Sequence, residues 1–148
     1  MADESVKVVG LKDLVRELKK LDDKGLTDGL KGVNFDVAQL VVNDAQGRAS
    51  GAMDSRAAAT LKPGRQAARA VVSGGGKAAP FFFGSEFGAM QNQLRQTPRR
   101  QVRGWNQFEP WTRTEGRWLY PAIRSSREKV IEMYGDAIEK ITKQAFPD

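Results

Sequence analysis

Apolar residues recur at helical spacing in three stretches of the chain. The longest stretch fills the last third, where the residues spaced three, four or seven positions apart include Ile123, Val130, Ile131, Tyr134, Ile138, Ile141 and Ala145. This spacing places them on one face of a long C-terminal helix. Pro121 suits the first turn of that helix, because the N–H that proline lacks would have no intrahelical partner there. The same pattern predicts one helix over 11–21 and another over 26–45.

Two glycines interrupt the second predicted helix. Gly29 and Gly32 each weaken it by about 1 kcal/mol relative to alanine. Glycines three positions apart on a helix could let another backbone approach closely, or they could simply be tolerated on an exposed surface. The pattern leaves both interpretations open.

The middle of the chain predicts strands. Residues 65–73 alternate loosely and end in two valines, which is typical of a strand, and a second strand is expected over 79–88. The glycines at 74–76 favour a hairpin turn, since a phosphate-binding loop would be followed by a helix carrying Lys and Ser or Thr. A third strand is expected at the start of the chain or over 113–119. The alanine-rich region before Pro63-Gly64 is ambiguous between a helical turn and a short strand.

These elements predict an α+β fold, in which a small antiparallel β-sheet packs against two N-terminal helices and a long C-terminal helix. The chain of 148 residues is long enough to bury a sizeable core, and we expect one domain over 1–148.

Three consecutive phenylalanines, Phe81, Phe82 and Phe83, lie within the second predicted strand. They cannot all face one side of a strand, so either the helix layer or a neighbouring subunit should cover at least one of them. Glu86 lies among these aromatic residues. A buried carboxylate can do acid–base chemistry, but no second carboxylate or base is nearby in the sequence, and this favours a structural hydrogen-bonding role.

The segment 89–117 combines six arginines with Trp105, Phe108 and Trp111, against only Glu109 and Glu115. Its prolines and glycines break any regular pattern. A loop of this length inside a compact domain usually indicates a binding function or disorder, and disordered chains are poor in tryptophan. Arginine with aromatic residues suits single-stranded nucleic acid, and it equally suits a protein–protein contact. We expect the loop to become ordered on a partner.

Composition narrows the chemistry further. The chain has a net charge of +6 and a sequence pI of about 9.8, which favours polyanions or acidic protein surfaces as partners. It contains no cysteine and no histidine, which excludes disulfides, thiolate nucleophiles, Cys/His zinc sites and histidine proton transfer.

The aspartates at 22, 23, 44 and 54 lack the spacing of a metal-binding site and are expected on the surface. The acidic N-terminus predicts no signal peptide, and no apolar run approaches the ~20 residues that span a bilayer.

Three short motifs carry a resemblance to a known family. They are Gly10-Leu11 at the start of the first helix, Glu86-Phe87-Gly88, and Trp118-Leu119-Tyr120-Pro121-Ala122-Ile123. With the order of the predicted elements, the chain resembles, from about residue 6 to 144, the neck proteins of long-tailed double-stranded DNA phages, also called head–tail joining or tail-completion proteins. The 89–117 segment departs from the family, since it looks longer and more aromatic than the usual connection.

The resemblance implies a structural virion protein rather than an enzyme, with no cofactor and no metal. Its copies would be made in the host cytoplasm and would form a six- or twelve-fold ring in the virion neck. The ring would contact connector or head-closure proteins on one side and the tail terminator or tail tube on the other. DNA would pass through the ring without sequence-specific binding, and no membrane would be involved.

Within the family, a tail terminator or a head-closure stopper is an alternative. Outside it, the alternative is a basic nucleic-acid-binding protein that uses the arginine- and tryptophan-rich loop.

Two surfaces are predicted to contact other subunits or partners: the aromatic segment 81–88 and the loop 89–117. With Trp118 and Tyr120 of the following segment, the residues assigned to subunit or partner contacts are Phe81, Phe82, Phe83, Glu86, Phe87, Arg95, Arg99, Arg100, Arg103, Trp105, Phe108, Trp111, Trp118 and Tyr120. Positive charge should lie on the subunit contacts rather than line the channel, because a strongly cationic channel would hold DNA back.

Overall fold

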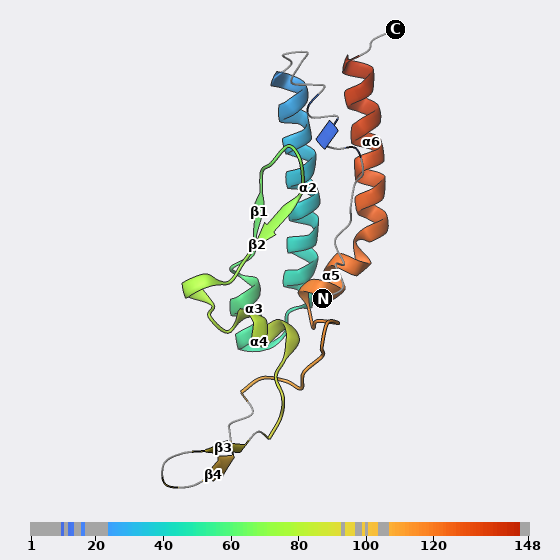
Figure 1. The fold of residues 1–148 in the computed structure, drawn as a ribbon. Helices are drawn as coiled ribbons and strands as arrows, with labels where there is room; N and C mark the ends of the chain where they lie inside the picture. Colours follow the sequence, from blue (N-terminus) through green and yellow to red (C-terminus); the bar gives the residue numbers. More distant parts are fainter. Residues whose placement is uncertain are drawn as a thin grey trace.

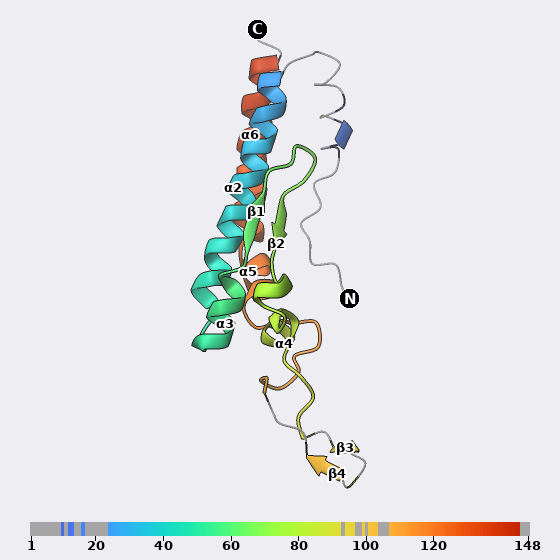
Figure 2. The ribbon, with the colours of Figure 1, turned by 90° about the vertical axis from the view of Figure 1, so that its left-hand side faces the viewer.

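The structure is a computed structural model, and it describes residues 10, 12–13, 16, 24–92, 94–96, 99, 101–103 and 107–145. The molecule is elongated (Figure 1). Helices α2 (Lys24–Arg48) and α6 (Arg127–Ala145) lie side by side and antiparallel at one end, and the hairpin of β3 (Leu94–Gln96) and β4 (Gln101–Arg103) projects at the other. A second view, turned by 90°, shows the same separation (Figure 2).

The two long helices pack through the stripes that the sequence predicts. Leu30 and Val37 of α2 meet Val130, Tyr134 and Ile141 of α6 in one buried cluster. Burying each such side chain contributes roughly 1.5–3 kcal/mol. The helix predicted over 26–45 is therefore confirmed as α2. Of the helix predicted over 11–21, only residues 12, 13 and 16 are described, and they are helical.

The C-terminal helix differs from the prediction in two respects. It is divided into α5 (Leu119–Ser125) and α6 at Ser126, although backbone hydrogen bonds continue through the bend from Ser126 N to Ala122 O and from Val130 N to Ser126 O. Pro121 lies in the first turn of α5, as expected. The predicted stripe is too wide, since Ile131 and Ile138 are 56% and 36% exposed. Both side chains lie on a face of α6 that does not pack against α2.

The sheet is smaller than predicted. Strands β1 (Lys62–Gly64) and β2 (Val71–Ser73) pair antiparallel, with Pro63 opposite Val72, and contact α2. The turn of this hairpin is formed by 65–70 and not by the glycines at 74–76. Gly74 instead lies against the core, because an added Cβ would be 2.8 Å from Leu61 Cδ2.

The predicted strand over 79–88 is wrong. After a 3₁₀ turn, η1 (Gly76–Ala78), the chain forms the short helix α4 (Phe82–Phe87). Helical spacing explains the difference, since it places Phe82, Ser85 and Glu86 on one buried face. The third strand expected over 113–119 is also absent, because these residues form turns and the start of α5. The alternative strand at the start of the chain lies outside the described residues.

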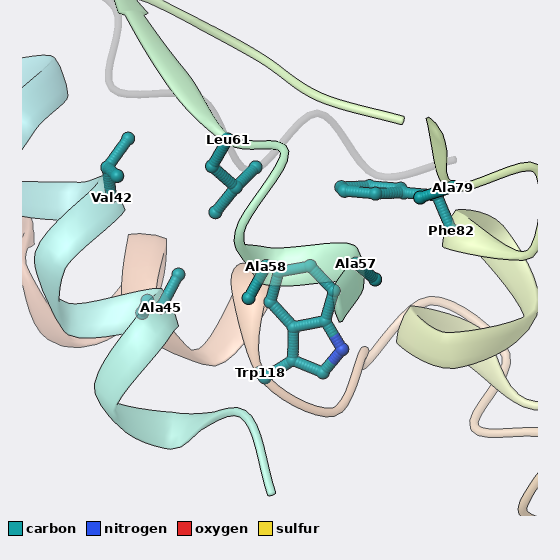
Figure 3. Close-up of a cluster of buried hydrophobic side chains, with 9 residues drawn as sticks. Val42, Ala45, Ala57, Ala58, Leu61, Ala79, Phe82 and Trp118 are labelled. Atoms are coloured by element: carbon teal, nitrogen blue, oxygen red, sulfur yellow. The ribbon is translucent and has the colours of Figure 1, made fainter. Parts of the chain in front are cut away.

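Trp118 is at the centre of a second buried cluster (Figure 3). The cluster joins α2 to α3 (Gly51–Ala58), α4 and α5, so the ambiguous alanine-rich region is a helix. The rings of Trp118 and Phe82 pack in a T-shaped arrangement with their centroids 5.3 Å apart. The α+β fold, with N-terminal helices, a small antiparallel sheet and a long C-terminal helix, is confirmed.

Candidate functional site

Residues 89–111, which we call the arm, leave and rejoin the body of the protein at one place. The N–H of Ala89 donates to Glu109 O at 2.9 Å, and the N–H of Thr112 donates to Phe87 O at 2.8 Å. Gly88 has a φ of 74°, and a Cβ there would collide with the backbone oxygens of the returning strand. Glycine is therefore required where the two ends of the arm cross.

The arm is more regular than the sequence suggests. Its β3 and β4 pair antiparallel, with Leu94 opposite Arg103 and Gln96 opposite Gln101. Arg99 lies between the two strands, and we call this end of the hairpin the tip. The expectation that prolines and glycines prevent regular structure here is thus wrong for these strands. The hairpin is two-stranded, so each strand also has an outer edge with no strand paired to it among the described residues.

Glu86 fixes the point at which the arm returns to the helices. Its carboxylate accepts hydrogen bonds from the first backbone N–H groups of α5: Trp118 N at 3.1 Å, Leu119 N at 2.9 Å and Tyr120 N at 2.8 Å. Trp118, the N-cap residue, makes no side-chain cap of its own. A negative charge at a helix N-terminus is favourable because the helix dipole is positive there. The predicted structural hydrogen-bonding role of this fully buried carboxylate is confirmed.

Gly116 makes room for this contact. Its φ is 72°, and a Cβ at this position would collide with Oε1 of Glu86. The N–H of Gly116 donates to the Thr112 hydroxyl at 3.2 Å, which holds the turn before α5. The backbone of the returning chain is therefore fitted to the carboxylate.

A second charged contact joins α3 to the same turn. Arg117 reaches both carboxylate oxygens of Asp54, at 3.0 Å from Nη1 and 2.9 Å from Nη2, and donates to Ser85 O at 2.9 Å. The Ser85 hydroxyl donates to Asp54 at 2.7 Å and accepts from Trp118 Nε1 at 3.2 Å. Asp54 is 5% exposed, so its predicted surface position is wrong. We call Asp54, Ser85, Glu86 and Arg117 the polar joint.

Apolar side chains are exposed on both the body and the arm. Phe83 is 72% exposed and stacks on Phe87, whose ring in turn lies 5.1 Å from that of Tyr120. On the arm, Leu94 is 65% exposed and Trp111 is 55% exposed. Large aromatic side chains that remain exposed are typical anchors of protein contacts.

Three of the predicted contact residues cannot touch a partner directly. Phe82, Glu86 and Trp118 are buried, because they form the core and the joint that hold the contact surface in place. Phe81 is half-buried, with the Arg56 guanidinium 5.2 Å from its ring centre, and Phe108 lies against Gly84.

The described arginine at the arm tip, Arg99, is exposed. Arg100 and Trp105 lie outside the described residues. Arg95 and Arg103 are placed in β3 and β4 by their backbones only.

Sequence reasoning missed Asp54, Ser85, Gly116 and Arg117. The hydrogen bonds among Asp54, Ser85 and Arg117 join residues 31 or more positions apart, so no local pattern connects Asp54 to Arg117 or Ser85. One signal was present, since no Ser, Thr, Asp or Asn precedes the helix at Leu119. Its first N–H groups therefore needed a cap from another part of the chain.

A shallow cavity of about 190 Å³ lies beside the joint, between residues 50–54 and 107–109 and against Arg117. The Arg117 side chain is already paired with Asp54. Every fully buried side-chain nitrogen and oxygen in the described part of the chain has a hydrogen-bond partner, so none is left for a ligand.

Among the described residues, no three acidic side chains converge as a metal site would require. Of the helices that the structure describes, none is long and apolar enough to cross a membrane. Comparison of the chain with protein-family models, with curated proteins and with solved structures finds no match in any of the three.

Proposed function

We propose that this protein is a structural component of a phage virion, which forms a homo-oligomeric ring at the head–tail junction and joins the head to the tail around the DNA channel. The observation that carries the proposal is the arm. It projects from one end of an elongated body, and buried charged groups fix both of its ends (Figure 1). The resemblance of the three sequence motifs supplies the biological setting.

The polar joint suits a protein whose task is to hold a contact surface. Burying charged groups is costly unless each is paired and hydrogen-bonded, and here Glu86, Asp54 and Arg117 are fully partnered. Such a joint fixes orientation more than it adds stability. An arm held in one orientation loses less conformational freedom when it meets a neighbour, which favours repeated, identical contacts.

Ring formation needs two different surfaces on each copy, because a closed ring is built from head-to-tail contacts. The arm with its exposed Leu94 and Trp111 offers one surface. The row of Phe83, Phe87 and Tyr120 on the body offers apolar area beside it.

The test combines assembly with mass. We expect the purified protein to assemble into a ring when it is mixed with purified head and tail components, as measured by sedimentation, and to restore joining in a phage that lacks the gene. A variant with Phe83→Ser and Trp111→Ser should fold normally but fail in both measurements. Lys77→Ser, a change at another exposed position, is the matched control. A wild-type chain that stays monomeric with these components and fails to restore joining would overturn the proposal.

The position within the neck is part of the same proposal. A neck subunit, a tail terminator and a head-closure stopper occupy adjacent places, and electron microscopy of labelled virions separates them. We favour the neck position because the arm and the helical end provide contact surfaces at opposite ends of one long molecule.

Nucleic-acid binding is the second candidate, because the positive charge is unevenly distributed. Residues 49–117 contain eleven Lys and Arg against four Asp and Glu, and Arg99 is exposed at the arm tip. This candidate predicts DNA binding whose log K falls linearly with log salt concentration. Absence of salt-dependent retention on DNA at low ionic strength would remove it.

A further inference from the structure

Helix α6 has an apolar stripe that the described chain leaves partly uncovered. Ile131 and Ile138 are 56% and 36% exposed, and seven positions on a helix place them on the same face. Gly135 lies between them on that face, and a Cβ added there would meet no atom within 4 Å. The stripe is therefore accessible and has room for a side chain from another molecule.

Acidic residues border this stripe on one side. Helical geometry places Glu128, Glu132 and Glu139 on the same flank of α6, and all three are exposed. Glu132 pairs with Lys129 at 3.3 Å and Glu139 with Lys143 at 2.6 Å. Exposed pairs of this kind contribute only about 0.3–0.5 kcal/mol, so an incoming guanidinium could replace either lysine.

The arm has the complementary chemistry. Leu94 is 65% exposed and Met90 is 64% exposed, and Arg99 is exposed at the tip beyond them. The arm thus presents apolar side chains followed by positive charge, while α6 presents apolar side chains bordered by negative charge.

These two surfaces cannot meet within one chain. The arm projects from the end of the molecule opposite to the free end of α6, in both views (Figures 1 and 2). A contact between them therefore joins two copies through different surfaces. Contacts of that type generate a ring if the rotation closes.

We propose that the arm of one copy docks on the Ile131–Ile138 stripe of a second copy, with Arg99 at its acidic border. The inference rests on the proposed ring and specifies which surfaces form its subunit contact. A nucleic acid would satisfy the arginines, but it would leave the isoleucines uncovered and would be repelled by the glutamates. A second copy accounts for both surfaces.

Site-specific crosslinking tests the contact directly, because the chain contains no cysteine. Full-length Leu94→Cys and Ile138→Cys variants, carrying different tags, are mixed with the purified head and tail components and oxidised. We expect the mixed disulfide between the two variants as the main crosslinked product. A predominance of Leu94→Cys homodimers or of Ile138→Cys homodimers would overturn the proposal.

A charge exchange tests the electrostatic part. Arg99→Glu and Glu132→Arg should each weaken self-association about tenfold, and the double variant should recover most of the loss. Lys77→Glu makes the same change in net charge as Arg99→Glu, away from both surfaces, and should have no comparable effect. No recovery in the double variant contradicts the pairing. A loss of DNA retention by Arg99→Glu with self-association unchanged shows that the arm binds nucleic acid instead.

The outcomes separate this inference from the proposed function. If the protein forms a ring without the mixed disulfide, the ring stands and the arm–α6 contact is wrong. If it forms no oligomer alone or with head and tail components, both are wrong.

Discussion

Different kinds of interaction stabilise the two ends of this molecule. At the helical end, α2 and α6 pack through apolar stripes, and the polar contact between them is neutral: the Tyr134 hydroxyl donates to Asn34 Oδ1 at 2.6 Å. The Asn34 amide in turn donates to Gln66 O at 2.7 Å and Ala67 O at 2.9 Å. At the arm end, the buried polar contacts involve charged groups, and Glu86 and Asp54 bind groups 31 or more positions away in the sequence.

This difference indicates what each end can tolerate. Stripe packing depends on volume and burial, so similar apolar side chains can replace one another with small losses. The polar joint depends on the position of individual atoms, because a buried charge without its partners is strongly destabilising. Substitutions at the joint should therefore cost more, and they should act on the arm as well as on the fold.

Glu86→Ala should have the largest effect. It leaves the three N–H groups at the start of α5 without acceptors in a buried site, and we expect a loss of about 4 kcal/mol in the free energy of unfolding. Chemical denaturation measures this loss. Glu139→Ala, which removes an exposed carboxylate from α6, is the matched control and should change stability by less than about 0.5 kcal/mol. Equal effects of the two substitutions would contradict the capping role.

Asp54→Ala should come next, at about 3 kcal/mol, because it leaves the partly buried Arg117 guanidinium without a carboxylate. Adding Arg117→Met should recover part of that loss, since the double variant no longer buries an unpaired charge. Denaturation of the two single variants and the double variant gives the coupling free energy. Additive losses would show that the two side chains act independently.

Replacing a glycine with alanine should have opposite effects on stability at the two ends of the molecule. Gly116→Ala places a Cβ against Glu86 at a φ of 72°, so it should destabilise the protein by about 2 kcal/mol or more. Gly29→Ala, in the open on α2, should stabilise it by about 0.5–1 kcal/mol through helix propensity. Thermal unfolding of both variants measures the contrast, and a destabilised Gly29→Ala would contradict the open position of this glycine.

The same contrast explains what could be predicted from the sequence. The stripes of α2 and α6 repeat over many turns, so their period was sufficient to find them, and with them the fold class. For Gly29 and Gly32 the sequence left two interpretations open, and the exposed-surface interpretation is correct, since a Cβ at either would meet nothing within 4 Å.

Short or long-range features were not predictable. Helix α4 spans six residues, too few for a period to distinguish it from a strand, and its three phenylalanines favour a strand by propensity. The partners of Glu86 and Asp54 are set by the tertiary fold. Ile131 and Ile138 have the right spacing for a core stripe, but α2 is too narrow to cover them as well as Val130 and Tyr134.

At the helical end, Tyr134→Phe should cost less than the changes at the joint. It removes the donor to Asn34 Oδ1 and leaves that buried oxygen unsatisfied, which should lower the free energy of unfolding by about 1–2 kcal/mol. Denaturation at pH 8 measures the loss. Tyr120→Phe, at a half-buried position on α5, serves as a comparison for the removal of one tyrosine hydroxyl.

The smallest expected effect is the pH dependence of the stability difference between the wild type and Tyr134→Phe. Burial raises the pKa of Tyr134 above its ordinary value of 10.0, and a hydrogen bond with the backbone of Ala70 partly offsets the shift. The unfolded chain therefore loses this proton first as the pH rises, so the contribution of Tyr134 to stability is complete below pH 10 and declines above it. Tyr134→Phe has no proton to lose, and the other titrating groups are shared. The stability advantage of the wild type over Tyr134→Phe, measured by urea denaturation, should thus be constant from pH 8 to just below pH 10 and should narrow above pH 10. An advantage that widens above pH 10 would show that the folded protein stabilises the tyrosinate instead.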